Sequence, residues 1–180
     1  MRTIAIVGNS AAGDGKGQGP EIDAHEYVLR FNDFSIDSCY RADFGRRVTH
    51  HAFHRGCISC ANNTAQLFML GNPNHYPPGW ESIESINAGP VTVIPPEYVR
   101  QCGRNAGVEN ECATSGLVMT LWMIEEGMHP VLYSFDGFAT GHYYPRWNDD
   151  NVRSATVTHD GKTELSYLKL LNYKGAITLK

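Results

Sequence analysis

The stretch that most constrains the fold begins at residue 4 and reads IAIVGNS. Four apolar residues, 4–7, run directly into Gly8, Asn9 and Ser10. Such a run is typical of a buried parallel strand that delivers a ligand loop at its carboxyl end. Residues 11–20 then contain four glycines, which predicts a loop whose backbone can approach a ligand closely. This pattern favours a nucleotide or another phosphate as the ligand.

Strand-like and helix-like segments alternate along the rest of the chain. The clearest helix is at 113–127, where Thr114 or Ser115 can cap the start and Gly127 supplies the stop. Residues 62–73 fit either a short helix or a strand. Strands are also predicted at 26–32, 47–54, 89–95 and 129–137, and an amphipathic helix at 163–175. The alternation predicts a Rossmann-like α/β fold, with a mostly parallel sheet and helices on both faces.

Composition narrows the class of protein. A length of 180 residues suits a single domain, 1–180. The formal net charge of -4 provides no broad basic field, so we expect no nucleic-acid partner. We expect neither a signal peptide nor a membrane helix, and the five irregularly spaced cysteines favour reduced thiols. These features predict a cytoplasmic protein, with peripheral attachment to the inner membrane left open.

The first loop differs from a dinucleotide-binding fingerprint. That motif has G-x-G-x-x-G directly after the strand and an acidic residue closing the second strand, whereas here Asn9 follows the glycine and Asn32 closes the second strand. A side-chain amide can donate to a phosphate or ribose oxygen and accept from a hydroxyl or an exocyclic amine. Both asparagines are therefore candidate nucleotide ligands, and turn capping is the alternative.

Four segments together resemble the motifs of one enzyme family. Residues 4–32 (IAIVGNSAAGDGKGQGPEIDAHEYVLRFN) and 41–54 (RADFGRRVTHHAFH) resemble the long sialyl motif of the animal-type sialyltransferases, glycosyltransferase family 29. Residues 113–138 resemble the short motif, GHYY at 141–144 the third motif, and HDGKTE at 159–164 the very short motif. The resemblance implies a short, bacterial-like or viral-like member with a variant GT-A-like fold.

The resemblance also implies a reaction and its residues. A sialyltransferase moves sialic acid from CMP-sialic acid to a glycan or glycolipid hydroxyl with inversion, and its single-phosphate donor calls for no metal or other cofactor. His159 is then the general base, His142 assists the departure of CMP, and Glu164 favours the N-terminus of the last helix, 163–175, or orients the loop of His159. The residues assigned to the donor are Gly8, Asn9, Ser10, Asn32, Thr114, Ser115, Gly116 and Gly137.

The chain also departs from the family pattern. We expect neither the membrane anchor nor the disulfide of eukaryotic members, and the chain is short enough that its acceptor-binding part is expected to be trimmed. In the short motif, Thr114 and Ser115 exchange the usual order of the two hydroxyl residues. Asp136 stands where the family has a small residue, so Gly137 comes one place late and its contact with the donor is in question.

Three alternatives stay open from the sequence. CMP-Kdo shares the carboxylate and the single phosphate of CMP-sialic acid, so it is a second candidate donor. A non-catalytic module that binds a cytidine nucleotide would need neither His142 nor His159. Separately, His54, Cys57 and Cys60 have a spacing within the range of zinc ligands, and a strand-to-loop turn with reduced thiols is the simpler interpretation.

Overall fold

A parallel sheet organises the molecule. The computed structural model describes residues 1–54, 62, 64–71, 91–144 and 159–180. Within these ranges seven strands form one sheet in the order β5-β4-β3-β2-β1-β6-β7, and each neighbouring pair is parallel. The strands are β1 (Arg2–Val7), β2 (Tyr27–Phe31), β3 (His50–His54), β4 (Gln66–Leu70), β5 (Val91–Ile94), β6 (Met128–Tyr133) and β7 (Thr178–Leu179).

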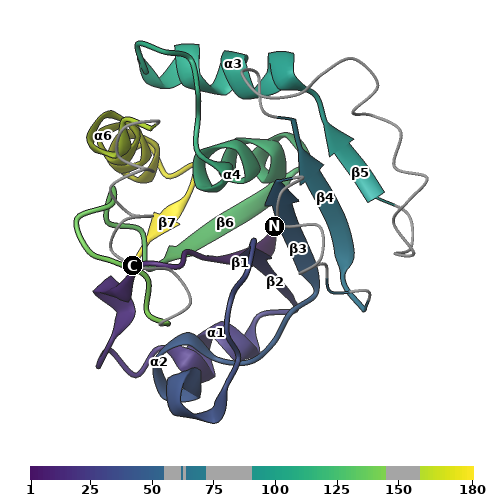
Figure 1. Ribbon diagram of the computed structural model, residues 1–180, viewed down its shortest axis with the longest axis vertical. Helices are drawn as coiled ribbons and strands as arrows, with labels where there is room; N and C mark the ends of the chain where they lie inside the picture. Colours follow the sequence, from purple (N-terminus) through teal and green to yellow (C-terminus); the bar gives the residue numbers. More distant parts are fainter. Residues whose placement is uncertain (55–61, 63, 72–90, 145–158) are drawn as a thin grey trace.

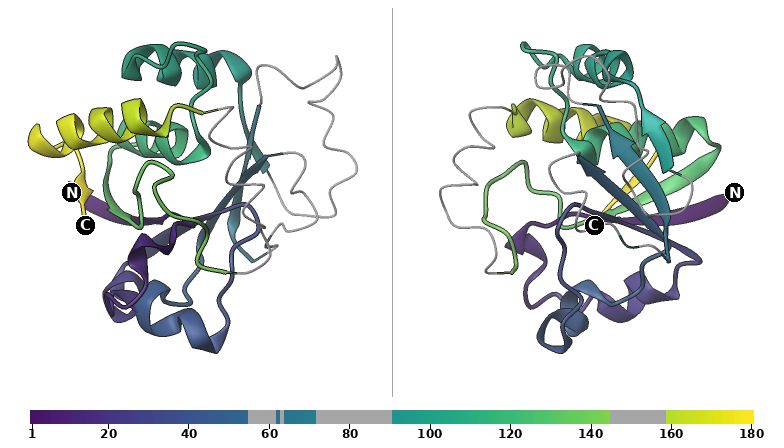
Figure 2. Two further views of the ribbon diagram at one scale, coloured as in Figure 1. Left: turned by 60° about the vertical axis from the view of Figure 1, so that its left-hand side comes forward. Right: turned by 45° about the vertical axis from the view of Figure 1, so that its right-hand side comes forward.

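Helices cover both faces of this sheet (Figures 1 and 2). One face carries α3 (Pro96–Ala106), α4 (Ser115–Glu125) and α6 (Gly161–Tyr173). The other carries α1 (Gly19–Ala24) and α2 (Arg41–Phe44), which are accompanied by the short 3-10 helices η1 (Ala11–Gly13) and η2 (Ser38–Tyr40). The predicted α/β fold, with a parallel sheet between two helical layers, is confirmed.

The sheet separates two hydrophobic clusters. Side chains of a strand alternate between its faces, so Ile4 and Ile6 of β1 belong to the cluster under α3, α4 and α6, whereas Ala5 and Val7 belong to the cluster over α1 and α2. Each of these four side chains is at most 1% exposed. A strand that is buried on both faces reads as a continuous apolar run, which is why β1 was recognisable in the sequence.

Several elements differ from the expectations. The segment left open at 62–73 contains β4, a strand at Gln66–Leu70. The last large predicted strand ends at Tyr133 because Ser134 has a left-handed backbone (φ 60) that cannot continue a strand. The short α1 and α2, the eleven-residue α3 and the two-residue β7 were not predicted. In the ranges described above, no helix combines the length and the apolar character needed to cross a bilayer.

Candidate active site

A cavity of about 290 Å³ opens at the carboxyl ends of the central strands. Its walls come from the loops after β1, β2 and β6, the end of β3, and the first turns of α4 and α6. Ligand sites of open α/β sheets lie at this edge. All eleven residues that the sequence analysis assigned to donor binding or catalysis line it: Gly8, Asn9, Ser10, Asn32, Thr114, Ser115, Gly116, Gly137, His142, His159 and Glu164. Their roles stay predictions, but their convergence is a property of the fold.

The two asparagines present opposite ends of their amides to a ligand. Asn9 Nδ2 donates to the Phe31 carbonyl oxygen at 3.1 Å, which leaves Asn9 Oδ1 as an acceptor. Asn32 Oδ1 accepts from the His54 backbone N–H at 3.2 Å, which leaves Asn32 Nδ2 as a donor. Because each protein partner can play only one role, these bonds fix the orientation of both amides. The pair therefore offers one acceptor and one donor from adjacent strands.

Unusual backbone conformations gather around the cavity. In the described part of the chain, four non-glycine residues have a positive φ, and three of them line the cavity: Asn32 (φ 48), Ser134 (φ 60) and Phe138 (φ 64). Such conformations cost free energy and cluster at functional sites, where the surrounding structure holds them. Their position at the loops after β2 and β6 marks this edge as the specialised part of the fold.

Helix α4 begins at the cavity with a side-chain cap. Thr114 Oγ1 accepts from the Leu117 backbone N–H at 3.2 Å, as the sequence predicted for one of the two cap candidates. The first amides of a helix have no partner within the helix and carry a partial positive charge. Ser115 and Gly116 line the cavity, so this wall has the partial positive charge that suits an anion.

Glu164 connects α6 to this cap. Its Oε1 accepts from the Thr114 backbone N–H at 2.8 Å, and its Oε2 is hydrogen-bonded to Thr114 Oγ1. Burial raises the pKa of Glu164 to about 7, against the lowering effect of the two Thr114 groups, and the nearby Asp160 charge raises it as well. Glu164 lies in the first turn of α6, as the sequence predicted, and its carboxyl group is bonded to the N-cap residue of α4, a contact that the sequence did not predict.

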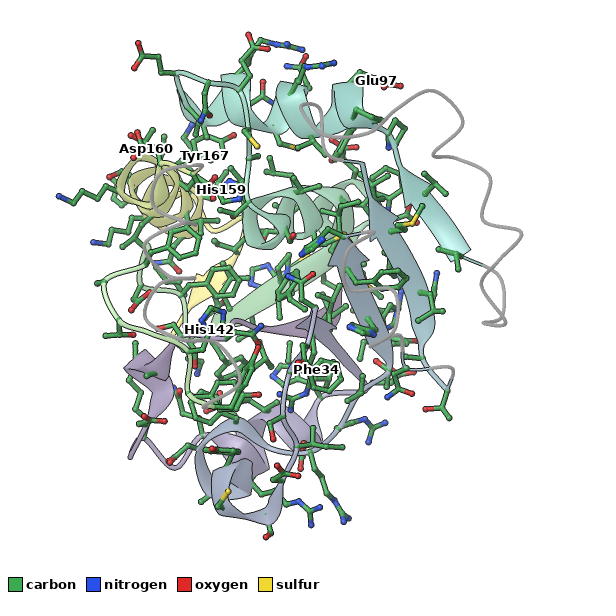
Figure 3. All side chains as sticks on the ribbon, in the orientation of Figure 1. Phe34, Glu97, His142, His159, Asp160 and Tyr167 are labelled. Atoms are coloured by element: carbon green, nitrogen blue, oxygen red, sulfur yellow. The ribbon has the colours of Figure 1, made fainter. Side chains whose placement is uncertain are left out.

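A hydrogen bond to the backbone fixes the orientation of the His159 ring. It lies beside the start of α6 in Figure 3, and its Nδ1 donates to the Cys112 carbonyl oxygen at 3.0 Å. Its ring stacks on Phe138, with 6.2 Å between ring centroids. Since Nδ1 must carry the proton to donate to a carbonyl, Nε2 of the neutral ring is the basic nitrogen. Burial lowers the pKa of His159, with the Cys112 carbonyl opposing the change, so the neutral form is favoured.

His142 reaches the cavity from a different segment. It forms an antiparallel bridge with Ser10, and Tyr143 N donates to the Asn9 carbonyl oxygen at 3.1 Å. In Figure 3 it lies below His159, on the loop that follows β6. Burial lowers the pKa of His142. The third motif is thus paired directly with the loop after β1, although the two lie near opposite ends of the sequence.

Three glycines at the cavity are needed for close contacts. A Cβ at Gly8 would lie 2.4 Å from the Ser134 carbonyl oxygen, and one at Gly116 would lie 2.7 Å from the Phe135 ring. Gly137 has a positive φ of 68, and a Cβ there would lie 2.6 Å from the Gly161 carbonyl oxygen. Gly137 comes one place later than the glycine of the family pattern. It still lies where the loop after β6 meets α6, a contact that leaves no room for a Cβ.

Sequence reasoning missed part of the loop after β6. Asp136 accepts from the backbone N–H groups of Phe138 and Thr140, and Thr140 Oγ1 contacts Ser10 Oγ at 2.8 Å. Asp136 therefore shapes the cavity wall instead of merely displacing a glycine. The available signal was the Asp-Gly pair, a turn former.

His54 also lines the cavity, although the sequence suggested it only as a zinc ligand. Burial lowers the pKa of His54, and a charge on His159 lowers it further. The other two suggested zinc ligands, Cys57 and Cys60, lie outside the described residues. Within the described ranges, no group of three or more histidine, cysteine, aspartate or glutamate side chains is arranged to hold a metal ion.

The fold and the cavity thus define an α/β protein with a cavity at the carboxyl edge of its sheet. The sequence model of glycosyltransferase family 29 (sialyltransferase) matches residues 1–90, half of the chain. The chain belongs to this family. The family that the motifs resemble is therefore confirmed.

Individual relatives extend the similarity beyond the first half. The chain is 46% identical over 184 aligned residues to CMP-N-acetylneuraminate-beta-galactosamide-alpha-2,3-sialyltransferase 1 of Mus musculus, with 91% of this chain and 54% of the mouse protein covered. The Sus scrofa protein of the same name is 42% identical, with 94% and 55% covered. The chain therefore spans about half the length of the curated relatives it matches.

Solved structures share the fold. A crystal structure of a mammalian sialyltransferase matches 99% of this chain and 68% of its own, with a TM-score of 0.74 and 18% identity. A second, in complex with Gal-beta-1-3GalNAc-ortho-nitrophenol, matches with a TM-score of 0.73 and covers 99% of this chain and 69% of its own. At this level of identity the likeness concerns the fold.

Proposed function

We propose that the protein transfers sialic acid from CMP-sialic acid to a hydroxyl of a glycan. The observation that carries the proposal is that four separate segments, which include the first loop and the starts of α4 and α6, bring all eleven motif residues to one cavity. A cavity at this edge of the sheet suits a nucleotide. Family membership supplies the class of reaction.

The polar groups of the cavity suit the donor. Asn9 Oδ1 can accept from the cytosine amine or a ribose hydroxyl, and Asn32 Nδ2 can donate to a ribose or phosphate oxygen. The amides at the start of α4 can bind the phosphate or the sugar carboxylate. One phosphate carries less charge than a diphosphate, so we propose that transfer needs no metal ion.

His159 is the proposed general base. The acceptor oxygen forms a bond to the anomeric carbon from the side opposite CMP, while the bond from that carbon to the phosphate oxygen breaks and its electron pair leaves with CMP. The hydroxyl proton passes to Nε2 of His159, which is free of the Cys112 hydrogen bond. His142 donates a hydrogen bond to the departing phosphate.

Glu164 is proposed as a positioning residue. Its carboxyl group holds Thr114, and the ring of His159 holds Cys112, two residues earlier in the same segment. Two independent hydrogen-bonded contacts thus lock the start of α6 against the start of α4. This arrangement sets the distance between the proposed base and the proposed anion-binding amides.

The acceptor is proposed from the relatives. The name of the Mus musculus relative specifies alpha-2,3 transfer to a beta-galactosamide, and Gal-beta-1-3GalNAc-ortho-nitrophenol is bound in one of the mammalian structures. We propose a galactose-terminated glycan or glycolipid of this kind. CMP-Kdo stays an alternative donor, because it presents the same nucleotide, phosphate and carboxylate.

The test combines binding with transfer. Calorimetric titration of chelator-treated protein with CMP, UMP and NAD should show selective binding of CMP. The same protein should then transfer sialic acid from CMP-sialic acid to Gal-beta-1-3GalNAc-ortho-nitrophenol and give no product from CMP-Kdo. Transfer from CMP-Kdo alone would assign the other donor, CMP binding without any transfer would indicate a non-catalytic module, and absence of CMP binding would refute the proposal.

The His159→Asn variant tests the base. An asparagine amide can keep the hydrogen bond to the Cys112 carbonyl but has no basic nitrogen, so transfer should fall by about 10²-fold or more while CMP affinity stays within about twofold. The matched control is His129→Asn, since His129 lies on β6 and contacts Thr178 instead of the cavity. Equal loss of CMP affinity and transfer in His159→Asn would contradict the assigned role.

A further inference from the structure

His51 lies behind the cavity wall and has no role in the mechanism above. It belongs to β3, is fully buried, and is not among the residues that line the cavity. Its ring contacts Phe34 edge-on, with 5.0 Å between centroids, and lies 5.4 Å from the ring of Phe53. Burying an imidazole costs free energy unless both of its ring nitrogens have hydrogen-bond partners.

Both ring nitrogens of His51 have partners, and these partners fix the tautomer. Nε2 lies 2.8 Å from the Asn32 carbonyl oxygen, which can only accept, so Nε2 carries the proton. Nδ1 accepts from the Asn62 backbone N–H at 3.1 Å, so Nδ1 is unprotonated. The neutral ring with its proton on Nε2 is thus the form that satisfies both neighbours.

The carbonyl that His51 holds belongs to a strained residue. Asn32 has a φ of 48, and its backbone N–H donates to the Ala52 carbonyl oxygen at 2.9 Å. The His54 N–H also donates to Asn32 Oδ1. Residues of β3 therefore contact the amide N–H, the carbonyl and the side chain of Asn32. Asparagine tolerates the left-handed region better than other non-glycine residues, but it needs such contacts to stay there.

We propose that His51 is a positioning residue of the donor site, whose Nε2–H fixes the Asn32 carbonyl and thereby directs Asn32 Nδ2 into the cavity. The placement of Asn32 follows from the contacts of β3, and its effect on CMP rests on the function proposed above. His51 acts only through Asn32, since it does not reach the cavity itself.

The surroundings of His51 favour the neutral ring. Burial lowers its pKa, whereas the hydrogen bond to Asn32 and the charge of Asp33 act in the opposite direction. The groups packed against the ring are the aromatic side chains of Phe34 and Phe53. A proton on Nδ1 would also face the Asn62 N–H, a second donor, and break that contact.

The neighbouring histidine provides a matched control. His50 lies on the same strand and is also buried, at 8% exposure, and burial lowers its pKa too. Its Nδ1 contacts Thr49 Oγ1 at 2.8 Å and its ring stacks on Phe68. Replacing His50 therefore disturbs β3 to a similar extent without touching Asn32.

Two substitutions separate the two ring nitrogens. In His51→Gln, the side-chain Nε2 can occupy the place of the ring Nε2 and keep the bond to Asn32. In His51→Asn, Oδ1 can replace ring Nδ1 and keep the bond to Asn62, but the bond to Asn32 is lost. Each variant thus retains one of the two contacts.

CMP titration of these variants gives the first result. We expect His51→Asn to bind CMP about tenfold more weakly, and His51→Gln and His50→Gln to stay within about threefold of the wild type. In transfer assays the His51→Asn defect should appear in KM for the donor more than in kcat. Wild-type affinity in a folded His51→Asn, or an equal defect in both His51 variants, would overturn the proposal.

Nuclear magnetic resonance gives a second result that does not depend on CMP. The ring nitrogens of His51 should show the tautomer protonated at Nε2, and the Asn32 side-chain amide signals should move in His51→Asn but not in His51→Gln. Absence of CMP binding by the wild type would refute the proposed function, and these signals would still decide the His51 proposal. A ring protonated at Nδ1, or equal movement of the Asn32 signals in both variants, would overturn it.

Discussion

Glu164→Gln should remove the pH dependence that Glu164 imposes on stability. Glu164 is 4% exposed, and its carboxyl group accepts hydrogen bonds from two neutral donors of Thr114. Its pKa is about 7 in the folded protein instead of 4.5, with burial as the largest cause. A carboxyl group whose pKa is raised by folding binds more protons in the folded state between these two values, so stability falls as the pH rises through this range.

The size of the effect follows from the pKa. At about 1.4 kcal/mol for each pKa unit, the change from 4.5 to about 7 corresponds to a loss of about 3 kcal/mol of folding free energy, complete above the folded-state value. Glutamine has the shape and charge of the protonated acid, so it avoids this loss. Its Oε1 can accept from the Thr114 N–H, and its amide group can donate to Thr114 Oγ1.

Urea unfolding, followed by circular dichroism, measures the difference. Between about pH 4 and pH 8, Glu164→Gln should change from similar stability to about 3 kcal/mol more stable than the wild type. The buried histidines, whose pKa values are lowered, affect both proteins equally and cancel in the difference. A difference that is flat across this pH range, or a Gln variant that is the less stable protein at the higher pH, would refute the reasoning.

Further predictions concern the cavity. Gly8→Ala should lower the free energy of unfolding by about 2–4 kcal/mol in urea titrations because of its contact with a carbonyl oxygen, whereas Gly141→Ala, with no atom within 4 Å of its Cβ, should change it by less than about 1 kcal/mol. Asn9→Ala and Asn32→Ala should each weaken CMP binding by about tenfold in calorimetry, and unchanged affinity in both would contradict the nucleotide site. The pH profile of kcat/KM should rise through a pKa below 6.5, the ordinary value of His159, because the base acts when neutral. A chelator should leave the transfer rate unchanged, and restoration of a lost rate by a divalent cation would show that a metal takes part.

The elements that were predictable are those whose pattern reflects burial. β1 is apolar throughout because both of its faces are covered, and α4 has a threonine cap, apolar residues on several faces and a terminal glycine. α3 was missed because its sequence is mostly polar and only Val99, Cys102 and Gly103 are buried. Its start was nevertheless marked by Pro96 at the first helical position and its end by Gly107, which adopts a left-handed backbone.

The residues of the site were easier to predict than the hydrogen bonds that hold them in place. Short motifs identified His142, His159 and the two asparagines, because strand ends and helix starts meet at one edge of a parallel sheet. The bond of Glu164 to Thr114 joins residues 50 positions apart, and no local pattern predicts it. The loop from Ser134 to Thr140 had a local signal in its Asp-Gly pair, but its contact with Ser10, 130 positions away from Thr140, has none.

The central position of β1 has a consequence for the order of folding. β1 pairs with β2, made soon after it, and with β6, whose residues 128–133 are made much later. During synthesis one edge of β1 therefore stays unpaired until β6 has left the ribosome, and an open apolar edge invites association with other chains. A fragment that ends after β5 should aggregate for the same reason. His142 and His159 follow β6 and precede β7, so a nascent chain completes its sheet and its binding site in the same last part of synthesis.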